Sequence, residues 1–562
     1  MSIEIMEARV IHSDSRAGRF LALCTEEQQL AYSHWRAFQK AGYPAVQVGQ
    51  VFKVRLGRDA RDGETLVVRE VIAECEAENI AISGVGRDSE QQLVSDRHWL
   101  DQLNASNGIT VVANKVLNGS EIFDLDIPGS LVLINCKVDG DFRWIRARFE
   151  GSFWCLNCQF ENHFSLKSAN LDGSVVIFGC DFSGPGGISF RGIKALSVLI
   201  EFGTRGGDDM LWLNEMTLRG CLTLNGSFDA PVQLLSKQDD APVNTQPRLN
   251  NVYIGRQSYH AEHLSRNEFS GGICVDGYDL DGDLEVHRST LGQLQLADIK
   301  ANSITVRDCE LTKDLSMNRV SIQDEAKGIA VEDSMIGRNL RMTGKSLRGR
   351  CRLSGTSVDQ SWILELEKPE DGTPAIEMSR FHAAQAWFDP VSLIYGSVPI
   401  RRLMSPPPFA LLANFDARSS DVENRRLLSE AYTCFKNWLA DTGHLREEDH
   451  AFFHMRDYKE SGRLRRLILG GFFGWGIRLR NVLCTALLVI GIFAFAFALT
   501  GFPSSEALML SLQSFISILF GEWSLPVPPA TSWLSLMVTM ESMIGVLLVT
   551  VLIGAYIRKL LR

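Results

Sequence analysis

Residues 129–182 read GSLVLINCKVD-GDFRWIRARFE-GSFWCLNCQFE-NHFSLKSANLD-GSVVIFGCDF, successive units of an eleven-residue repeat. Each unit begins with glycine or asparagine, and apolar side chains follow two, four and nine positions later. Position seven is small, and it alternates so that Cys136, Cys158 and Cys180 recur every 22 residues. Alternate residues of a strand share one face, and fixed periods of this kind are typical of solenoids. The repeat therefore predicts a right-handed β-helix with coils of about 22 residues.

The predicted solenoid covers residues 106–400. The same spacing returns at 209–224 and, more weakly towards its end, at 282–358. Between 228 and 272 it is lost in a polar segment with three prolines and two histidines. We expect an insertion there. It is either a ligand-binding loop, as insertions in solenoids often are, or an ordinary solvated loop.

One tempting motif lies inside the repeat. Cys155 and Cys158 have the C-x-x-C spacing of redox and zinc sites, but both fall on inward positions of the predicted coil. Buried cysteine usually packs as a small hydrophobe, and a zinc site needs a second pair of ligands. We therefore expect neither a metal nor a cofactor here. The sequence also contains no nucleotide loop and no convincing catalytic triad, so no catalytic residue is assigned and an enzyme is not expected.

The last eighty residues are strongly apolar. From 481 to 557 the only charged side chains are three glutamates. Two apolar runs, 482–500 and 533–557, are long enough to cross a bilayer, which takes roughly 20 residues. The segment between them, 504–529, is too short and too polar to span, so we expect a pore helix followed by a re-entrant loop. Residues 481–562 are thus predicted to form a two-helix transmembrane pore domain.

Charge sets the predicted orientation. Arginines precede the first apolar run, basic residues follow the second, and the connecting segment has none. By the positive-inside rule both termini of this two-pass protein face the cytoplasm, and the connecting loop faces outward. The absence of an N-terminal apolar stretch and the scattered distribution of twelve cysteines agree with a reducing compartment. The net charge of -10 argues against general affinity for nucleic acid.

Residues 401–480 are predicted to link the solenoid to the membrane. A proline-rich break is followed by helical periodicity over 425–460, which indicates an amphipathic helical hairpin. Residues 470–480 combine glycines, Trp475 and arginines, a composition suited to the headgroup layer.

The N-terminal 75 residues read as short β segments. Their order and spacing resemble a cold-shock-type OB barrel, a family that stacks single-stranded bases on aromatic side chains. Phe20 matches the first family motif in part, and His34 with Trp35 match the second. The resemblance implies possible nucleic-acid stacking at these residues, and the alternative is that the aromatics fill a small core. Residues 76–105 are expected to form a helical linker.

Residues 425–562 resemble the C-terminal half of bacterial pentapeptide-repeat ion-channel proteins, whose pores belong to the two-transmembrane potassium-channel superfamily. The resemblance implies a homotetramer that conducts monovalent cations. It places the following residues at the constriction: Ser517, Ile518, Leu519, Phe520, Gly521 and Glu522. It places Ser514 in the pore helix and Glu541 and Gly545 in the last, gating helix. Glu541 is either a functional acid of the pore or the partner of a structural hydrogen bond to a neighbour's pore helix, through Ser514 or Trp523. Leu519 stands where the family has a glycine, so we expect an atypical filter without potassium selectivity.

The sequence thus predicts an oligomeric inner-membrane cation channel, gated by an unknown cytoplasmic ligand acting on the β-solenoid sensor. A role in stress or phage defence would follow if opening depolarises the cell. The alternative is a membrane-tethered solenoid scaffold without conductance.

Overall fold

The computed structural model describes residues 4–13, 20–25, 27, 29–43, 45–47, 49–58, 66–75, 94–96, 100, 108–182, 186–202, 210–236, 247–255, 266–324, 327–344, 351–366, 376–388, 421–520 and 532–560. The chain divides into two compact units. The first comprises Met1–Pro374 with Phe381–Phe388, and the second comprises Ala375–Arg380 with Asp389–Arg562.

The first unit begins with a small closed barrel of five strands. These are β1 (Glu4–Ser13), β2 (Phe20–Thr25), β3 (Leu30–His34), β4 (Val51–Arg58) and β5 (Leu66–Cys75), with the short helix α1 (Trp35–Lys40) after β3. Around the barrel the order is β1-β2-β3-β5-β4. Strands β3 and β5 pair in parallel, and the other neighbours pair antiparallel. Alternate apolar residues such as Leu23 and Val54 fill the interior, and Phe38 of α1 packs among them.

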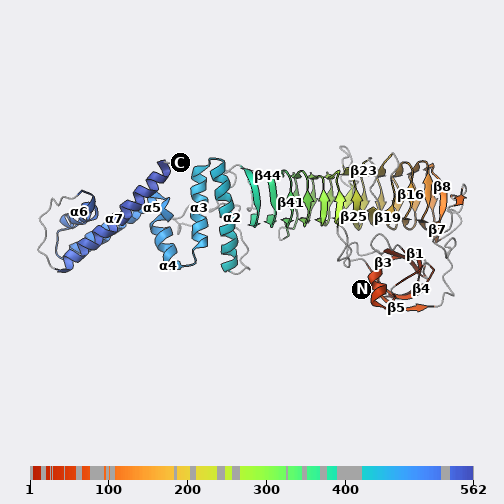
Figure 1. The fold of residues 1–562 in the computed structure, drawn as a ribbon, viewed down its shortest axis with the longest axis horizontal. Helices are drawn as coiled ribbons and strands as arrows, with labels where there is room; N and C mark the ends of the chain where they lie inside the picture. The colour runs from red at the N-terminus through yellow and green to blue at the C-terminus, as the bar shows by residue number, and fades with distance from the viewer. Residues whose placement is uncertain are drawn as a thin grey trace. The chain divides into compact units, whose positions relative to one another are not determined.

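The rest of the first unit is a parallel β-solenoid, whose strands stack in a continuous row (Figure 1). Each coil contributes up to four short strands, one to each of four faces. The first face contains β7 (Ile109–Ala113), β11 (Ser130–Ile134), β15 (Phe153–Leu156), β19 (Val175–Cys180), β22 (Val198–Phe202), β25 (Cys221–Phe228), β28 (Asn251–Ile254), β32 (Asp283–His287), β36 (Ser303–Arg307), β40 (Ile329–Glu332) and β43 (Cys351–Ser354). The second contains β6 (Val94–Asp96), β8 (Lys115–Asn118), β12 (Lys137–Asp139), β16 (Gln159–Phe160), and later β29 (Asn267–Phe269), β33 (Ser289–Leu291), β37 (Glu310–Leu311) and β41 (Met335–Ile336).

The third face contains β9 (Glu121–Phe123), β13 (Phe142–Ile145), β17 (Phe164–Lys167), β20 (Ile188–Arg191), β23 (Leu211–Asn214), β26 (Val232–Leu235), β30 (Ile273–Asp276), β34 (Leu294–Ala297), β38 (Leu315–Asn318), β42 (Leu340–Gly344), β44 (Ser357–Leu366) and β46 (His382–Phe388). The fourth contains β10 (Asp126–Ile127), β14 (Arg148–Phe149), β18 (Asn170–Leu171), β21 (Lys194–Ala195), β24 (Thr217–Leu218), β27 (Arg248–Leu249), β31 (Asp279–Leu280), β35 (Lys300–Ala301) and β39 (Ser321–Ile322). The solenoid predicted from the eleven-residue repeat is confirmed.

The sequence repeat corresponds to half a coil. Its apolar positions form the interior, where like side chains stack on one another: the rings of Phe142 and Phe164 lie 5.2 Å apart and nearly parallel. The sixth residue after each marker takes a left-handed backbone, with φ of 50° at Asn135 and 52° at Asn157. Asparagine tolerates this conformation better than most residues, and it turns the chain from one face to the next.

Two expectations about the solenoid need correction. The insertion expected over 228–272 instead contains β26 to β29, all of which pair with neighbouring coils. The repeat is hidden there because the coils are longer: partners on the third face are 21 residues apart for Leu211 and Val232, but 41 apart for Val232 and Ile273. The extra segments, 237–246 and 256–265, lie outside the described residues, as do both histidines. Part of the expected helical linker is also a strand, since β6 pairs with β8 on the second face.

The second unit is mainly helical. It contains β45 (Ile376–Ser379), α2 (Asp421–Asp441), α3 (Leu445–Lys459), α4 (Arg463–Arg465), the π-helix η5 (Arg466–Phe472), the 3-10 turn η6 (Gly474–Gly476), α5 (Leu479–Leu499), α6 (Ser504–Phe520) and α7 (Ser532–Leu560). Helices α2 and α3 pack side by side as a hairpin (Figure 1). Tyr432 of α2 stacks on His454 and Tyr458 of α3.

Candidate functional site

Two helices of the described chain are long and apolar enough to cross a membrane. They cover Leu479–Leu499 and Trp533–Ile557, close to the two spans expected from the sequence. Most of their large side chains remain exposed, as in Leu487, Phe495 and Met543. An apolar surface of this extent needs a non-aqueous or protein environment.

The third apolar helix, α6, packs against both of these helices, and we call α5, α6 and α7 the three-helix module. Near its N-terminus, Ala507 and Leu510 contact Phe497 of α5 and Leu534 of α7. Near its C-terminus, Phe515 packs with Val482 and Leu548. Helix α6 has 17 residues, about 26 Å at 1.5 Å per residue, which falls short of a bilayer core of about 30 Å.

A buried polar cluster joins the three helices. Glu541 of α7 is fully buried, and its carboxyl accepts a hydrogen bond from the hydroxyl of Ser511 on α6. The same hydroxyl lies 2.9 Å from the carbonyl oxygen of Ile490 on α5. A hydroxyl has one proton, so Ser511 can donate to only one of these acceptors at a time. Ser542 adds a bond from α7 to the carbonyl oxygen of Ser514, at 2.8 Å.

Gly545 brings α6 and α7 into close contact. A Cβ atom at this position would lie 2.2 Å from the carbonyl oxygen of Phe515, far inside contact distance. The family resemblance gives this glycine a gating role. The structure gives it a packing role, and the two roles make different predictions for its substitution by alanine.

The predicted constriction is described only in part. Ser517, Ile518, Leu519 and Phe520 form the last turn of α6, which remains helical to Phe520. No glycine interrupts the helix before position 521. Nothing is described for the side chains of these four residues, and Gly521 and Glu522 lie outside the described residues.

A compact elbow joins the helical hairpin to α5. Three consecutive residues, Gly474, Trp475 and Gly476, have positive φ values of 53°, 54° and 73°. The side chain of Asn481 donates to the carbonyl oxygen of Gly471 at 3.1 Å, and that of Thr485 donates to Phe472 at 2.8 Å. These bonds satisfy carbonyls at the end of the π-helix, a role that sequence reasoning missed.

Charged groups cluster beside the elbow. The guanidinium of Arg478 lies over the ring of Phe453 in α3, 5.8 Å from its centroid. Burial lowers the pKa of His450, and the positive charges of Arg478 and Arg446 lower it further. Burial, and then Arg480, lower the pKa of Arg478. The elbow therefore combines a tight backbone with groups that are costly to charge.

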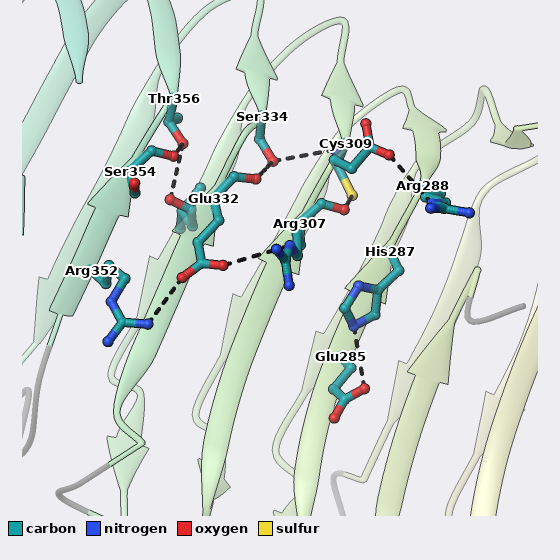
Figure 2. Close-up of polar contacts among 12 residues, drawn as sticks. Glu285, His287, Arg288, Arg307, Cys309, Glu332, Ser334, Arg352, Ser354 and Thr356 are labelled. Atoms are coloured by element: carbon teal, nitrogen blue, oxygen red, sulfur yellow. Dashed lines mark hydrogen bonds and ion pairs between the residues drawn. The ribbon is translucent and has the colours of Figure 1, made fainter. Parts of the chain in front are cut away.

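On the first face of the solenoid, charged side chains form a ladder over the last coils (Figure 2). Glu332 lies between two arginines, 3.7 Å from Arg307 and 3.2 Å from Arg352. On β32, which pairs with the strand that carries Arg307, His287 lies 3.3 Å from Glu285. Partly exposed pairs of this kind contribute little stability singly, so we regard the ladder as a polar surface and not as a structural support.

The C-x-x-C pair is part of the interior. Cys155 and Cys158 are buried free thiols, as the repeat predicts. Burial raises the pKa of Cys155 well above its usual value, which makes it a poor nucleophile. Among the described residues, no group of three or more His, Cys, Asp or Glu side chains could hold a metal ion.

In the barrel, the residues predicted to stack bases lie close in the backbone. Phe20 of β2 is directly opposite His34 of β3, and Trp35 begins α1. Their side chains are outside what the structure describes. In comparisons with known proteins, no family model, no curated protein and no solved structure matches the chain.

Proposed function

We propose that the protein is an oligomeric ion channel of a bacterial inner membrane, gated through its β-solenoid. The observation that carries the proposal is the packing of α6, an apolar helix too short to span, between two helices of spanning length. A soluble or simply anchored protein has no evident use for this third helix. Where such an element turns back inside the membrane, its non-helical backbone must be buried in protein or line a water-filled cavity. The wall of a pore meets this requirement.

Several copies are required, because one pair of spanning helices cannot enclose an aqueous path. The resemblance to two-transmembrane channels favours a homotetramer in which Ser517, Ile518, Leu519, Phe520, Gly521 and Glu522 surround the constriction. An acidic ring at Glu522 would attract monovalent cations. Leu519 disfavours the left-handed backbone of a potassium filter, so weak selectivity among cations is expected.

The remaining parts supply the input to the channel. The barrel is a closed sheet of five strands with one parallel pair, between β3 and β5, and its sequence resemblance to OB barrels favours a ligand-binding role. A ligand bound to the barrel or the solenoid would favour one arrangement of the pore by differential affinity. If opening depolarises the cell, a role in stress or phage defence would follow.

Single-channel recording of the purified full-length protein in planar lipid bilayers tests this proposal. We expect cation-selective openings and, in Leu519→Gly, an increased preference for potassium over sodium. Leu512→Gly, at an exposed position on the same helix, is the matched control and should leave selectivity unchanged. Equal effects of the two substitutions would mean that position 519 is not in a filter.

A second function, a membrane-tethered scaffold without conductance, is favoured by one observation. Helix α6 remains helical through Phe520, so residues 517–520 have the helical backbone of an anchor. Under this alternative the charged ladder of the solenoid is the working surface. Correctly folded protein that never conducts in bilayers, over a range of lipid compositions and voltages, would favour the scaffold.

A further inference from the structure

The outward side of the first solenoid face changes character along its length. In the early coils its outward residues are apolar and buried, and we call them the apolar stripe: Val111, Val132, Ile134, Trp154, Leu156, Val176 and Phe178. In the later coils the corresponding residues are polar or charged, as in Glu285, Arg307 and Arg352. The change begins at β22, where Glu201 pairs with Phe178 while Leu199, which pairs with Val176, is still apolar.

The strand patterns show that this stripe is specific to one face. On the first face, β15 and β19 are buried at four consecutive positions. On the third face, β13 and β17 bury only alternate residues and leave polar side chains such as Arg143 and Ser165 outside. Both faces enclose the same interior, so the interior does not require the extra apolar residues.

The barrel covers the stripe. Ile11, Ala22 and Cys24 are buried in one cluster with the stripe, and Leu30 and Tyr32 pack against it. Strand β2 is therefore buried on both sides, because Leu21 and Leu23 fill the barrel interior. In the β2–β3 register, Phe20 and His34 form the next alternate pair after Cys24 with Leu30 and Ala22 with Tyr32.

We propose that the barrel is an intramolecular clasp: its β2–β3 surface recognises the chain's own apolar stripe, and while the clasp is closed that surface is not free for single-stranded nucleic acid. The surface is the one that OB-like barrels use for oligonucleotides. A ligand for the barrel must then compete with the solenoid, which converts binding into release of the barrel. The inference does not depend on whether the protein conducts ions.

Cys24 provides a direct readout of the clasp. Burial raises the pKa of its thiol to about 11, although the charge of Arg9 acts in the opposite direction. Cys309 in the solenoid interior also has its pKa raised to about 11 by burial, so it is a matched internal reference. Release of the barrel should expose Cys24 and leave Cys309 protected.

The experiment is peptide-resolved alkylation of the full-length protein by N-ethylmaleimide. In the wild type, both thiols should react slowly. Trp154→Arg places a charge in the stripe and should speed alkylation of Cys24 at least about tenfold, with Cys309 unchanged. Trp212→Arg makes the same change at an outward, exposed position on the third face and should have no effect. Fast alkylation of Cys24 in the wild type, or no change in Trp154→Arg, overturns the clasp.

A variant on the barrel side covers the case in which Trp154→Arg damages the coil, which alkylation of Cys155 would reveal. Tyr32→Glu leaves the solenoid sequence intact and should expose Cys24 while Cys155 stays protected. Nucleic acid is tested with a short fluorescein-labelled oligo(dT). We expect no Phe20-dependent binding by the wild type. Binding by the wild type that Phe20→Ala abolishes would show the surface to be open and would overturn the proposal.

Discussion

Two glycines, one in the solenoid and one in the three-helix module, allow equally close contacts with different neighbours. A Cβ at Gly151 would lie 2.2 Å from the hydroxyl of Ser130 in the preceding coil. A Cβ at Gly545 would lie 2.2 Å from the carbonyl oxygen of Phe515. The serine can rotate only by giving up the hydrogen bond that its hydroxyl accepts from the Ser152 amide, and the same contact recurs at Gly173. The carbonyl belongs to a helix, and among the described residues of the module this contact occurs once. In the solenoid, close contacts of this kind are repeated from coil to coil. In the module, a single close contact joins α6 and α7.

The largest effect is expected from removing a whole side chain from the repeated interior. Trp144 is fully buried, with its ring centroid 4.4 Å from that of Phe142. Trp144→Ala should lower the opening free energy of nearby coils by about 3–5 kcal/mol, measured by hydrogen exchange. Trp212→Ala, at a partly exposed outward position, is the control and should change it by less than about 1 kcal/mol. A loss of protection throughout the solenoid in Trp144→Ala would contradict the view that its stability is distributed over many coils.

Gly545→Ala tests the concentrated contact. Because the backbone of α6 cannot move aside locally, we expect destabilisation of the module at the upper end of the roughly 1–3 kcal/mol typical of overpacking. Thermal unfolding in nanodiscs would measure it. Gly554→Ala lies on the same helix with no atom within 4 Å, so it should be neutral or slightly stabilising. Similar results for the two variants would mean that α6 and α7 do not approach as described.

Gly151→Ala sharpens the comparison from the other side. The Ser130 hydroxyl can turn away if it gives up its hydrogen bond from the Ser152 amide, and backbone atoms also lie 2.9 Å from the new Cβ. We expect the substitution to lower the opening free energy of β11 and β15, measured by the hydrogen exchange of their amides, by about 1–2 kcal/mol. This is less than the destabilisation expected for Gly545→Ala. A cost above that of Gly545→Ala would reverse the ranking of the two regions.

The helical hairpin should respond to pH through His450. Its pKa is lowered on folding, so the unfolded chain binds the proton at higher pH than the folded hairpin does. Stability is therefore complete above the unfolded pKa of 6.5 and declines as the pH falls below it towards the folded pKa. Melting temperatures measured from pH 8 to about 5 would show the decline. His450→Gln should flatten the profile, while His444→Gln, at an exposed position, should preserve it.

The smallest effect is expected at the solenoid surface. Arg319 forms a bidentate ion pair with Asp298, but the pair is solvent-exposed. The charges of an exposed pair stay hydrated whether or not they are paired. Arg319→Gln should therefore leave the hydrogen exchange of the coil's amides unchanged within error. A clear loss of protection would show that the surface ion pairs stabilise the coils, and it would contradict the view that the packed interior does so.

Much of the solenoid could be predicted from the sequence, because each inward position is repeated and the pattern is redundant. Prediction failed over 228–272, where longer coils broke the period while the strand pairing continued. It also missed the apolar stripe. Val132, Trp154 and Val176 recur every 22 residues as clearly as the cysteines do, but they lie three positions after the marker, between the inward positions two and four.

The three-helix module was predictable in outline only. Composition indicated the helices, since a long run without charge has few other uses. Nothing in the sequence indicates that Gly545 packs against Phe515, because that contact depends on how two helices cross. The constriction from Ser517 to Glu522 rests on resemblance, and its residues stay a prediction.

The stacking of coils has a consequence for how such a chain changes length. Neighbouring strands in a sheet are about 4.8 Å apart, so each complete turn advances the solenoid by that step. Duplication of one 22-residue segment such as 131–152 would add one step and reproduce every contact between neighbours. The distance between the first and last turns can therefore change during evolution in steps of one strand spacing, while the sequences of the terminal coils stay the same.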